Sequence, residues 1–114
     1  MPYLKIETNA DLGAGGADAL AARASELVGE LTGKPERWVM ARVEAGAALR
    51  FGGAAEPAAF VEMKSIGLSA EACPRLAEAL CAFLQAEAGI PPERVYIEFK
   101  DLERGMFGWK GGTF

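Results

Sequence analysis

The sequence predicts an α+β fold made of two β-α-β units, with a four-stranded mixed sheet and both helices on one face. An internal repeat is the main observation. At an offset of 57 residues, Tyr3–Thr8 aligns with Phe60–Ser65, and both segments alternate in polarity as strands do. The same offset aligns Glu36–Met40 with Glu93–Ile97, two further predicted strands. Because crossovers between parallel strands are right-handed, both intervening helices are expected on the same side of the sheet.

Each repeat contains one helical pattern between its strands. Apolar residues recur at helical spacing at Leu20, Ala24, Leu27, Val28 and Leu31, and again at Leu76, Leu80, Phe83 and Leu84. Asp18 is the predicted N-cap of the first helix, and Ser69 or a residue near it caps the second. Gly33 and Gly89 are the predicted stops, because glycine adopts the left-handed conformation without a steric penalty. Pro74 lacks a backbone N–H, so the second helix is expected to start near it or to bend there.

The last long strand has two different faces. Side chains of a strand alternate, so one row faces the helices and the other points away. The apolar row is Val95, Ile97 and Phe99, and the opposite row is Tyr96, Glu98 and Lys100. No predicted helix covers that second side, which therefore needs a partner, a ligand or water.

The C-terminal segment Gly105–Phe114 combines three aromatic residues with four glycines. Such a segment cannot bury its own apolar surface. Two interpretations stay open: a final edge strand that completes the core, or a segment that packs between subunits or forms the wall of a pocket.

The composition limits the class of protein. A chain of 114 residues with 51% hydrophobic and 25% charged residues is typical of one globular domain, residues 1–114, with pseudo-repeats of approximately 1–57 and 58–114. A net charge of −4 without a basic run argues against nucleic acid as a partner. No apolar run approaches the roughly 20 residues that span a membrane, and the N-terminus lacks signal-peptide features, so we expect a cytoplasmic protein. A domain this small favours self-association.

Missing residue types narrow the chemistry. Histidine is absent, which excludes Ser-His-Asp triads, Cys-His pairs and most zinc sites, and no metal is expected. Cys73 and Cys81 lie two helical turns apart, too far for a disulfide, and are interpreted as buried thiols.

The segment Gly13–Asp18 invites comparison with a dinucleotide fingerprint. Because Asp18 takes the place of the third glycine, where its charge would repel a pyrophosphate, we interpret the segment as a flexible loop.

Two residues are candidates for catalysis. Removal of Met1 would expose the secondary amine of Pro2, and burial beside a cation lowers the pKa of such an amine toward neutrality. A neutral amine is a competent general base, although a proline at this position can also have no catalytic role. Lys34, between Gly33 and Pro35, is placed to hold a carboxylate. Its alternative interpretation is a charge that favours the helix dipole.

Six short motifs occur in a characteristic order. They are Met1-Pro2, Thr32-Gly33-Lys34-Pro35, Phe51-Gly52-Gly53 followed by Glu56-Pro57, Ser65-Ile66-Gly67, Arg94-Val95-Tyr96-Ile97, and Gly108-Trp109 with Thr113-Phe114. In this combination the chain closely resembles the macrophage migration inhibitory factor family of the tautomerase superfamily, its bacterial members in particular. The match runs nearly end to end. It implies a homotrimer whose sheets surround a central channel, with active sites at the subunit interfaces.

The resemblance also implies an activity and a set of site residues. The expected activity is keto-enol tautomerisation of 2-keto acids such as phenylpyruvate, with Pro2 as the catalytic base, Lys34 on the substrate carboxylate and no cofactor. The substrate-binding residues that it implies are Ser65, the backbone amide of Ile66, Tyr96 from the neighbouring subunit, Glu98, and an aromatic wall of Trp38, Phe107, Trp109 and Phe114.

The chain departs from the animal cytokine at three places. Glu98 replaces an asparagine, Lys100 replaces a tyrosine, and Ala58 and Val61 replace a Cys-x-x-Cys pair. The last change removes any basis for the thiol oxidoreductase activity proposed for the family. Glu98 either repels a carboxylate or pairs with a cation. The alternative to an enzyme is a cytokine-like or scaffold protein with a vestigial pocket, which would meet a receptor only after non-classical secretion.

Overall fold

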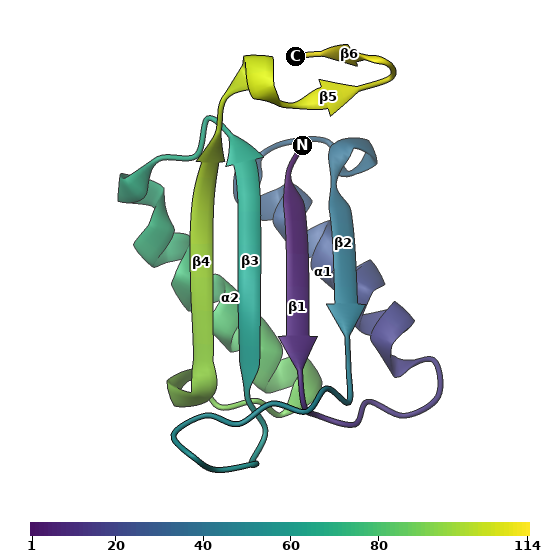
Figure 1. Ribbon diagram of the computed structural model, residues 1–114, viewed down its shortest axis with the longest axis vertical. Coiled ribbons are helices and arrows are strands. Elements are labelled where there is room, and N and C mark those ends of the chain that lie inside the picture. Colours follow the sequence, from purple (N-terminus) through teal and green to yellow (C-terminus); the bar gives the residue numbers. More distant parts are fainter.

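One four-stranded sheet and two helices form the body of the molecule (Figure 1). The computed structural model describes residues 1–114. The main elements are, in chain order, β1 (Tyr3–Thr8), α1 (Gly16–Thr32), β2 (Met40–Glu44), β3 (Ala59–Ile66), α2 (Cys73–Ala88) and β4 (Val95–Leu102), followed by the short strands β5 (Gly108–Trp109) and β6 (Gly112–Thr113). Four 3-10 helices lie between them: η1 (Glu36–Trp38), η2 (Ala70–Ala72), η3 (Pro92–Arg94) and η4 (Arg104–Met106).

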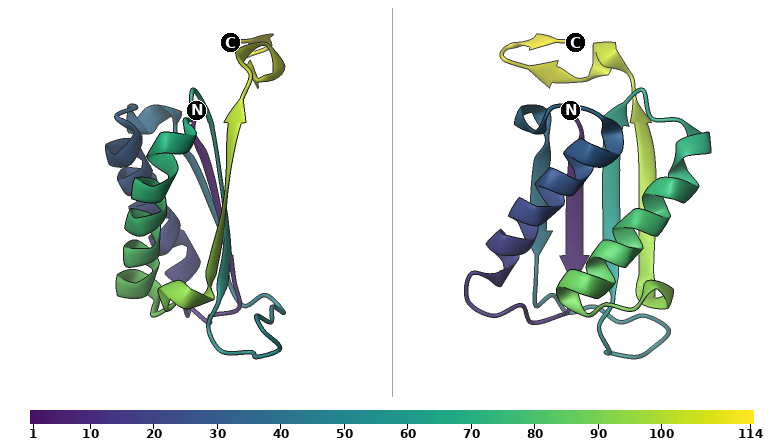
Figure 2. Two further views of the ribbon diagram at one scale, coloured as in Figure 1. Left: turned by 90° about the vertical axis from the view of Figure 1, so that its left-hand side faces the viewer. Right: turned by 180° about the vertical axis from the view of Figure 1, so that it is seen from behind.

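The main sheet is mixed, as predicted. Its strand order is β2-β1-β3-β4, with β1 parallel to β2, antiparallel to β3, and β3 parallel to β4. Both helices cover the same face of this sheet (Figure 2). This arrangement leaves the other face without a covering layer, and it confirms the predicted fold class. Neither helix combines the length and the apolar character that crossing a lipid bilayer requires.

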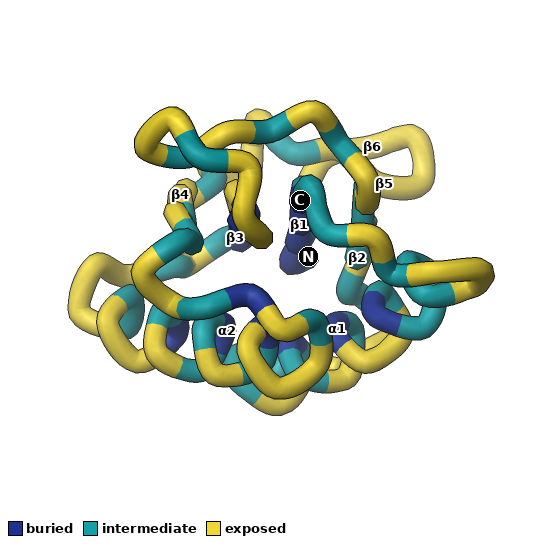
Figure 3. Tube along the Cα trace, turned by 90° about the horizontal axis from the view of Figure 1, so that it is seen from below, coloured by how far each residue is buried: buried dark blue, intermediate teal, exposed yellow.

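The core lies between the sheet and the helices, where Figure 3 shows the buried positions gathered. Leu4 and Ile6 alternate with half-buried neighbours along β1, and the predicted helical rows supply the opposite side of the core. The helix residues buried there are Leu20, Ala24, Val28, Leu76, Leu80 and Leu84. Full burial of one leucine or isoleucine stabilises a fold by about 1.5–3 kcal/mol, so this core holds the two layers together.

The predicted helix stops are confirmed, whereas the predicted N-cap of the first helix, Asp18, is wrong. Gly33 and Gly89 end α1 and α2 in the left-handed conformation, with φ of 69° and 66°. The N-cap of α1 is Gly15, which places Asp18 inside the first turn, where a negative charge still favours the helix dipole. Ser69 precedes η2 and makes no side-chain capping bond, and α2 itself begins with Pro74 in its first turn. Proline fits there because the first turn needs no backbone donor.

Two of the predicted strands begin later than expected. Glu36–Trp38 and Pro92–Arg94 form 3-10 turns, and the strands that follow start at Met40 and Val95. Both turns follow a proline, Pro35 or Pro91, whose carbonyl accepts a bond from three residues ahead, and Pro92 occupies the first position of the second turn, where its fixed φ fits. Trp38 N lies 3.0 Å from the Pro35 oxygen, and Arg94 N lies 2.9 Å from the Pro91 oxygen.

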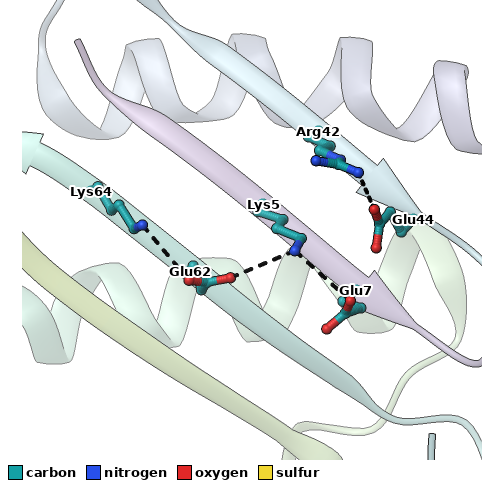
Figure 4. A network of polar contacts seen from close by, with 6 residues as sticks. All are labelled: Lys5, Glu7, Arg42, Glu44, Glu62 and Lys64. Carbon is teal, nitrogen blue, oxygen red and sulfur yellow. Dashed lines mark hydrogen bonds and ion pairs between the residues drawn. The ribbon is translucent and has the colours of Figure 1, made fainter. Parts of the chain in front are cut away.

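The uncovered sheet face carries charged side chains (Figure 4). The Nζ of Lys5 lies 3.9 Å from Glu7 Oε2 and 4.0 Å from Glu62 Oε2. The Nζ of Lys64 lies 3.9 Å from Glu62 Oε1. The predicted division of β4 is confirmed: Val95, Ile97 and Phe99 pack against the core, while Tyr96, Glu98 and Lys100 are exposed. The charged part of this face is therefore suited to water or to a polar partner.

The C-terminal segment does not add a strand to the main sheet, so that interpretation is wrong. Strands β5 and β6 pair only with each other, and Figure 2 shows them folded over the end of the sheet where the chain begins. The η4 turn after β4 redirects the chain away from the sheet edge.

Cys73 and Cys81 are both free, and they are half-buried rather than fully buried because α2 lies on the outside of the molecule.

Candidate active site

A cavity of about 390 Å³ lies at the end of the sheet, between the start of the chain and the β5–β6 hairpin. Pro2 lines it, and its ring is fully buried. The Pro2 carbonyl accepts a hydrogen bond from the Met40 amide at 2.9 Å, which extends the pairing of β1 with β2 by one step. Pro2 is therefore held in place by backbone contacts. In the structure its nitrogen is bonded to Met1.

Aromatic residues form one wall of this cavity. Trp38 comes from η1, and the others come from the C-terminal segment. The rings of Trp38 and Trp109 meet edge to face with centroids 4.9 Å apart, and Phe114 lies 6.2 Å from Trp109 and 5.6 Å from Phe107. The Phe114 amide donates to the Phe107 carbonyl at 3.1 Å. All four predicted wall residues thus meet at one place, and the C-terminal segment forms a pocket wall.

Lys34 lies beside this cavity rather than in it. Its ammonium group donates to Ser65 Oγ at 2.9 Å and to the Ile66 carbonyl at 2.8 Å. Lys34 lines an adjoining cavity of about 480 Å³, together with Ile66 and Arg104. Burial, and secondly the charge of Arg104, lower the pKa of the Lys34 side chain. The three predicted residues Lys34, Ser65 and Ile66 therefore form one connected group.

The two cavities are neighbours that share part of their walls. Met1, Trp38 and Phe114 line both. Burial, and secondly the charge of Lys34, lower the pKa of the α-amino group of Met1. The start of the chain is therefore in surroundings that disfavour a protonated amine.

Tyr96 and Glu98 lie away from this end of the sheet. Tyr96 is opposite Phe60 on β3, is 63% exposed, and packs against Phe51 with ring centroids 4.8 Å apart. Glu98 is opposite Glu62 near the middle of the uncovered face. Neither residue lines the two cavities. Within one chain, the structure does not bring them to Pro2.

Three cations at the site were not predicted from the sequence. Arg37 and Lys64 line the first cavity, Arg104 lines the second, and no aspartate or glutamate lines either one. Arg37 also lies over the Trp38 ring, 5.3 Å from its centroid. The position of Arg37 next to Trp38 was the only local signal, since Lys64 and Arg104 reach the site through tertiary folding. In a protein of net charge −4, this end of the molecule is selectively suited to an anion.

Fold and site together define a class: a duplicated β-α-β protein with an aromatic, cation-rimmed cavity around the start of its chain. The family model described as macrophage migration inhibitory factor (MIF) matches residues 1–114. The chain belongs to this family.

Individual relatives agree with this assignment. A macrophage migration inhibitory factor homologue of Brugia malayi is 38% identical over 115 aligned positions, which cover 100% of this chain and 99% of the relative. The crystal structure of a homologue from Prochlorococcus marinus has a TM-score of 0.90 at 34% identity and covers 98% of both chains. The structure of the Trichinella spiralis protein has a TM-score of 0.91 at 31% identity, with 98% of this chain and 99% of the other covered.

Proposed function

We propose that this protein is a keto-enol tautomerase of aromatic 2-keto acids such as phenylpyruvate, with Pro2 as the base once Met1 has been removed. One observation carries the proposal: a buried proline at the start of the chain lines an aromatic cavity whose borders hold cations and no aspartate or glutamate side chain. An aromatic ring matches the Trp and Phe wall, and a carboxylate matches the cations. Membership of the MIF family supports the same activity class.

The proposed reaction moves one proton between carbon and oxygen. The neutral Pro2 amine takes a proton from C3 of the keto acid, the C2 oxygen gains the negative charge, and the ammonium form of Pro2 returns the proton to that oxygen to give the enol. The reverse direction follows the same steps. Lys34, whose charge influences the amine of Met1, would offset the charge of the carboxylate and of the developing oxyanion. A low pKa of the amine keeps it available as a base near neutral pH.

A homotrimer is part of the proposal, because one chain leaves two of the expected site residues far from Pro2. In a trimer with sites at the interfaces, Tyr96 and Glu98 of a neighbouring subunit would approach the cavity. The uncovered, charged sheet face supports such an assembly, since the balanced Lys and Glu side chains offer complementary contacts (Figure 4). The proposed substrate would then be enclosed by two subunits.

The test uses protein whose mass shows that Met1 has been removed. Phenylpyruvate tautomerisation is measured for this protein, Pro2→Gly and Lys34→Ala, with Arg23→Ala as a control cation that pairs with Glu87 on the helical side of the molecule. We expect Pro2→Gly to lose most turnover and Lys34→Ala mainly to raise KM. Equal activity in all variants would refute the proposal and favour a partner-binding protein with a vestigial pocket.

A further inference from the structure

Arg104 stands out among the arginines of the chain because it has no partner. Arg23 and Arg42 form ion pairs, Arg50, Arg75 and Arg94 donate to backbone carbonyls, and Arg37 lies over Trp38. None of the five ion pairs of the structure includes Arg104. It belongs to η4, directly after β4, and its side chain lines the cavity that also contains Lys34. Its guanidinium group is free to bind a ligand.

Lys34 has little hydrogen-bonding capacity left for a ligand. An ammonium group has three N–H donors, and two of those of Lys34 are used by Ser65 Oγ and the Ile66 carbonyl. A guanidinium group has five donors in a planar fork that matches both oxygens of a carboxylate. Of the two cations, Arg104 is therefore the better carboxylate ligand, and Lys34 is the more firmly held charge.

No acidic side chain of the protein neutralises this pair of cations. The carboxylate of Asp101 lies close in sequence, but its Oδ1 accepts bonds from the amides of Gly67 and Leu68 at 3.0 and 3.1 Å. It fixes the turn that forms one side of the cavity. Two like charges beside one cavity repel each other, and the repulsion also contributes to the lowered pKa of Lys34. An anion bound between them removes this repulsion.

The arrangement of the two cavities places a substrate in one orientation. Met1, Trp38 and Phe114 line both cavities, so removal of Met1 would take away part of the wall that the cavities share. A carboxylate bound by Lys34 and Arg104 in the second cavity would lie beside the first cavity, which Pro2 lines, and the aromatic wall of the first cavity would receive the ring. In a 2-keto acid the reacting carbon C3 is located between these two ends, next to the proposed base.

We propose that Arg104 is a second substrate-binding residue, which holds the carboxylate of the 2-keto acid together with Lys34. This inference rests on the proposed tautomerase function and specifies how the substrate is recognised. Arginine at this position makes a free carboxylate a requirement for tight binding, so an ester of the same acid loses the contribution of Arg104.

Kinetics with two substrates test the inference. Arg104→Ala and Arg104→Lys are compared with the unchanged protein and with the Arg23→Ala control, using phenylpyruvate and its methyl ester. We expect Arg104→Ala to raise KM for phenylpyruvate about tenfold with kcat changed by less than about threefold, and to leave KM for the ester nearly unchanged. Arg104→Lys should recover part of the loss. An equal effect on acid and ester, or no effect on either, would overturn the inference.

A binding measurement separates this inference from the proposed function. Both tryptophans of the chain, Trp38 and Trp109, line the first cavity, so their fluorescence reports a bound ligand without turnover. The probe is 3-phenylpropanoate, which has the carbon skeleton of the substrate without its keto group. Arg104→Ala should weaken its binding about tenfold, even if Pro2→Gly were fully active and the tautomerase proposal failed. Unchanged binding in Arg104→Ala, with a Pro2→Gly variant that is inactive, would refute the role of Arg104 alone.

Discussion

The ammonium group of Lys34 donates a hydrogen bond to Ser65 Oγ at 2.9 Å, and this contact joins the end of α1 to the end of β3. Ser65 is only 2% exposed, so the bond is largely shielded from water. The same ammonium group also binds the Ile66 carbonyl. Lys34 is thus a fixed charge beside the cavity of Pro2, and its position depends on a hydroxyl group 31 residues further along the chain.

Replacing Ser65 with alanine removes one of the two anchors of Lys34. We expect Ser65→Ala to lower the free energy of unfolding by about 1 kcal/mol, because a buried hydrogen bond to a charged donor is lost. Urea denaturation measures this change. Ser69→Ala is the matched control, since the Ser69 side chain makes no capping bond. Equal midpoints for the two variants would contradict the role of Ser65.

The charge of Lys34 should contribute to the pH dependence of the reaction. Burial, and secondly the charge of Lys34, lower the pKa of the Met1 amine, so loss of this charge in Lys34→Ala should raise the pKa of the Pro2 amine in the processed protein. A base works only when it is neutral, and activity therefore rises as pH rises through this pKa. The acidic limb of the kcat/KM profile should move to higher pH in Lys34→Ala and stay in place in Arg23→Ala. An unmoved limb in Lys34→Ala would show that the two groups are not coupled.

Arg94 should contribute strongly to stability, because it holds the loop before β3. Its guanidinium donates to the carbonyls of Phe51, Ala54, Glu56 and Pro57 at 3.0–3.2 Å. We expect Arg94→Ala to lower the free energy of unfolding by about 2 kcal/mol, since these carbonyls lose a shared donor. Chemical denaturation measures the effect.

The control for this loop is Arg50→Ala. Arg50 makes a single contact there, to the Gly53 carbonyl at 3.0 Å. Its removal should cost less than about 0.5 kcal/mol, as for most surface substitutions. A similar decrease in the free energy of unfolding for Arg50→Ala and Arg94→Ala would mean that the four contacts of Arg94 stabilise the protein no more than the single contact of Arg50.

Neighbouring positions on α2 should differ sharply in their tolerance to alanine. Leu80 is 1% exposed in the core between sheet and helices, whereas Cys81 is half-buried. Leu80→Ala should destabilise the protein by about 3 kcal/mol through lost burial and a residual cavity. Cys81→Ala should change stability by less than about 1 kcal/mol. Thermal and urea unfolding measure both changes. A similarly small loss of stability in Leu80→Ala and Cys81→Ala would show that the core around Leu80 is loosely packed.

If Tyr96 acts on the Pro2 of another subunit, two inactive variants should restore activity when they assemble together. Pro2→Gly retains Tyr96, and Tyr96→Ala retains Pro2. After unfolding and joint refolding at equal amounts, about a quarter of the interface sites would contain both intact residues. Activity above that of either variant alone is the expected result. No recovery in co-assembled protein would place Tyr96 outside the site.

Much of the secondary structure could be predicted from local sequence patterns. The alternation in Tyr3–Thr8 and Phe60–Ser65, the helical spacing of the leucines and the glycines after each helix depend on residues a few positions apart, and the structure agrees with them. The predicted strands Glu36–Met40 and Glu93–Ile97 are wrong in their first residues, which belong to the 3-10 turns Glu36–Trp38 and Pro92–Arg94. The fixed φ of Pro92 favours the second turn, and in both repeats the apolar pattern extends into the strand that follows the turn.

The assembly of the candidate site could not be predicted from local patterns. Pro2, Lys34 and Trp38 were singled out from motifs, but the partners of Lys34, the place of Arg104 beside it and the folding of the C-terminal segment over Pro2 depend on how the sheet brings distant strand ends together. Hydrophobic periodicity and turn-forming residues involve positions close together in the chain, so they can be recognised in the sequence. Charge surroundings, hydrogen-bond partners and cavity walls arise from contacts between residues far apart in sequence, and these exist only after the layers have packed.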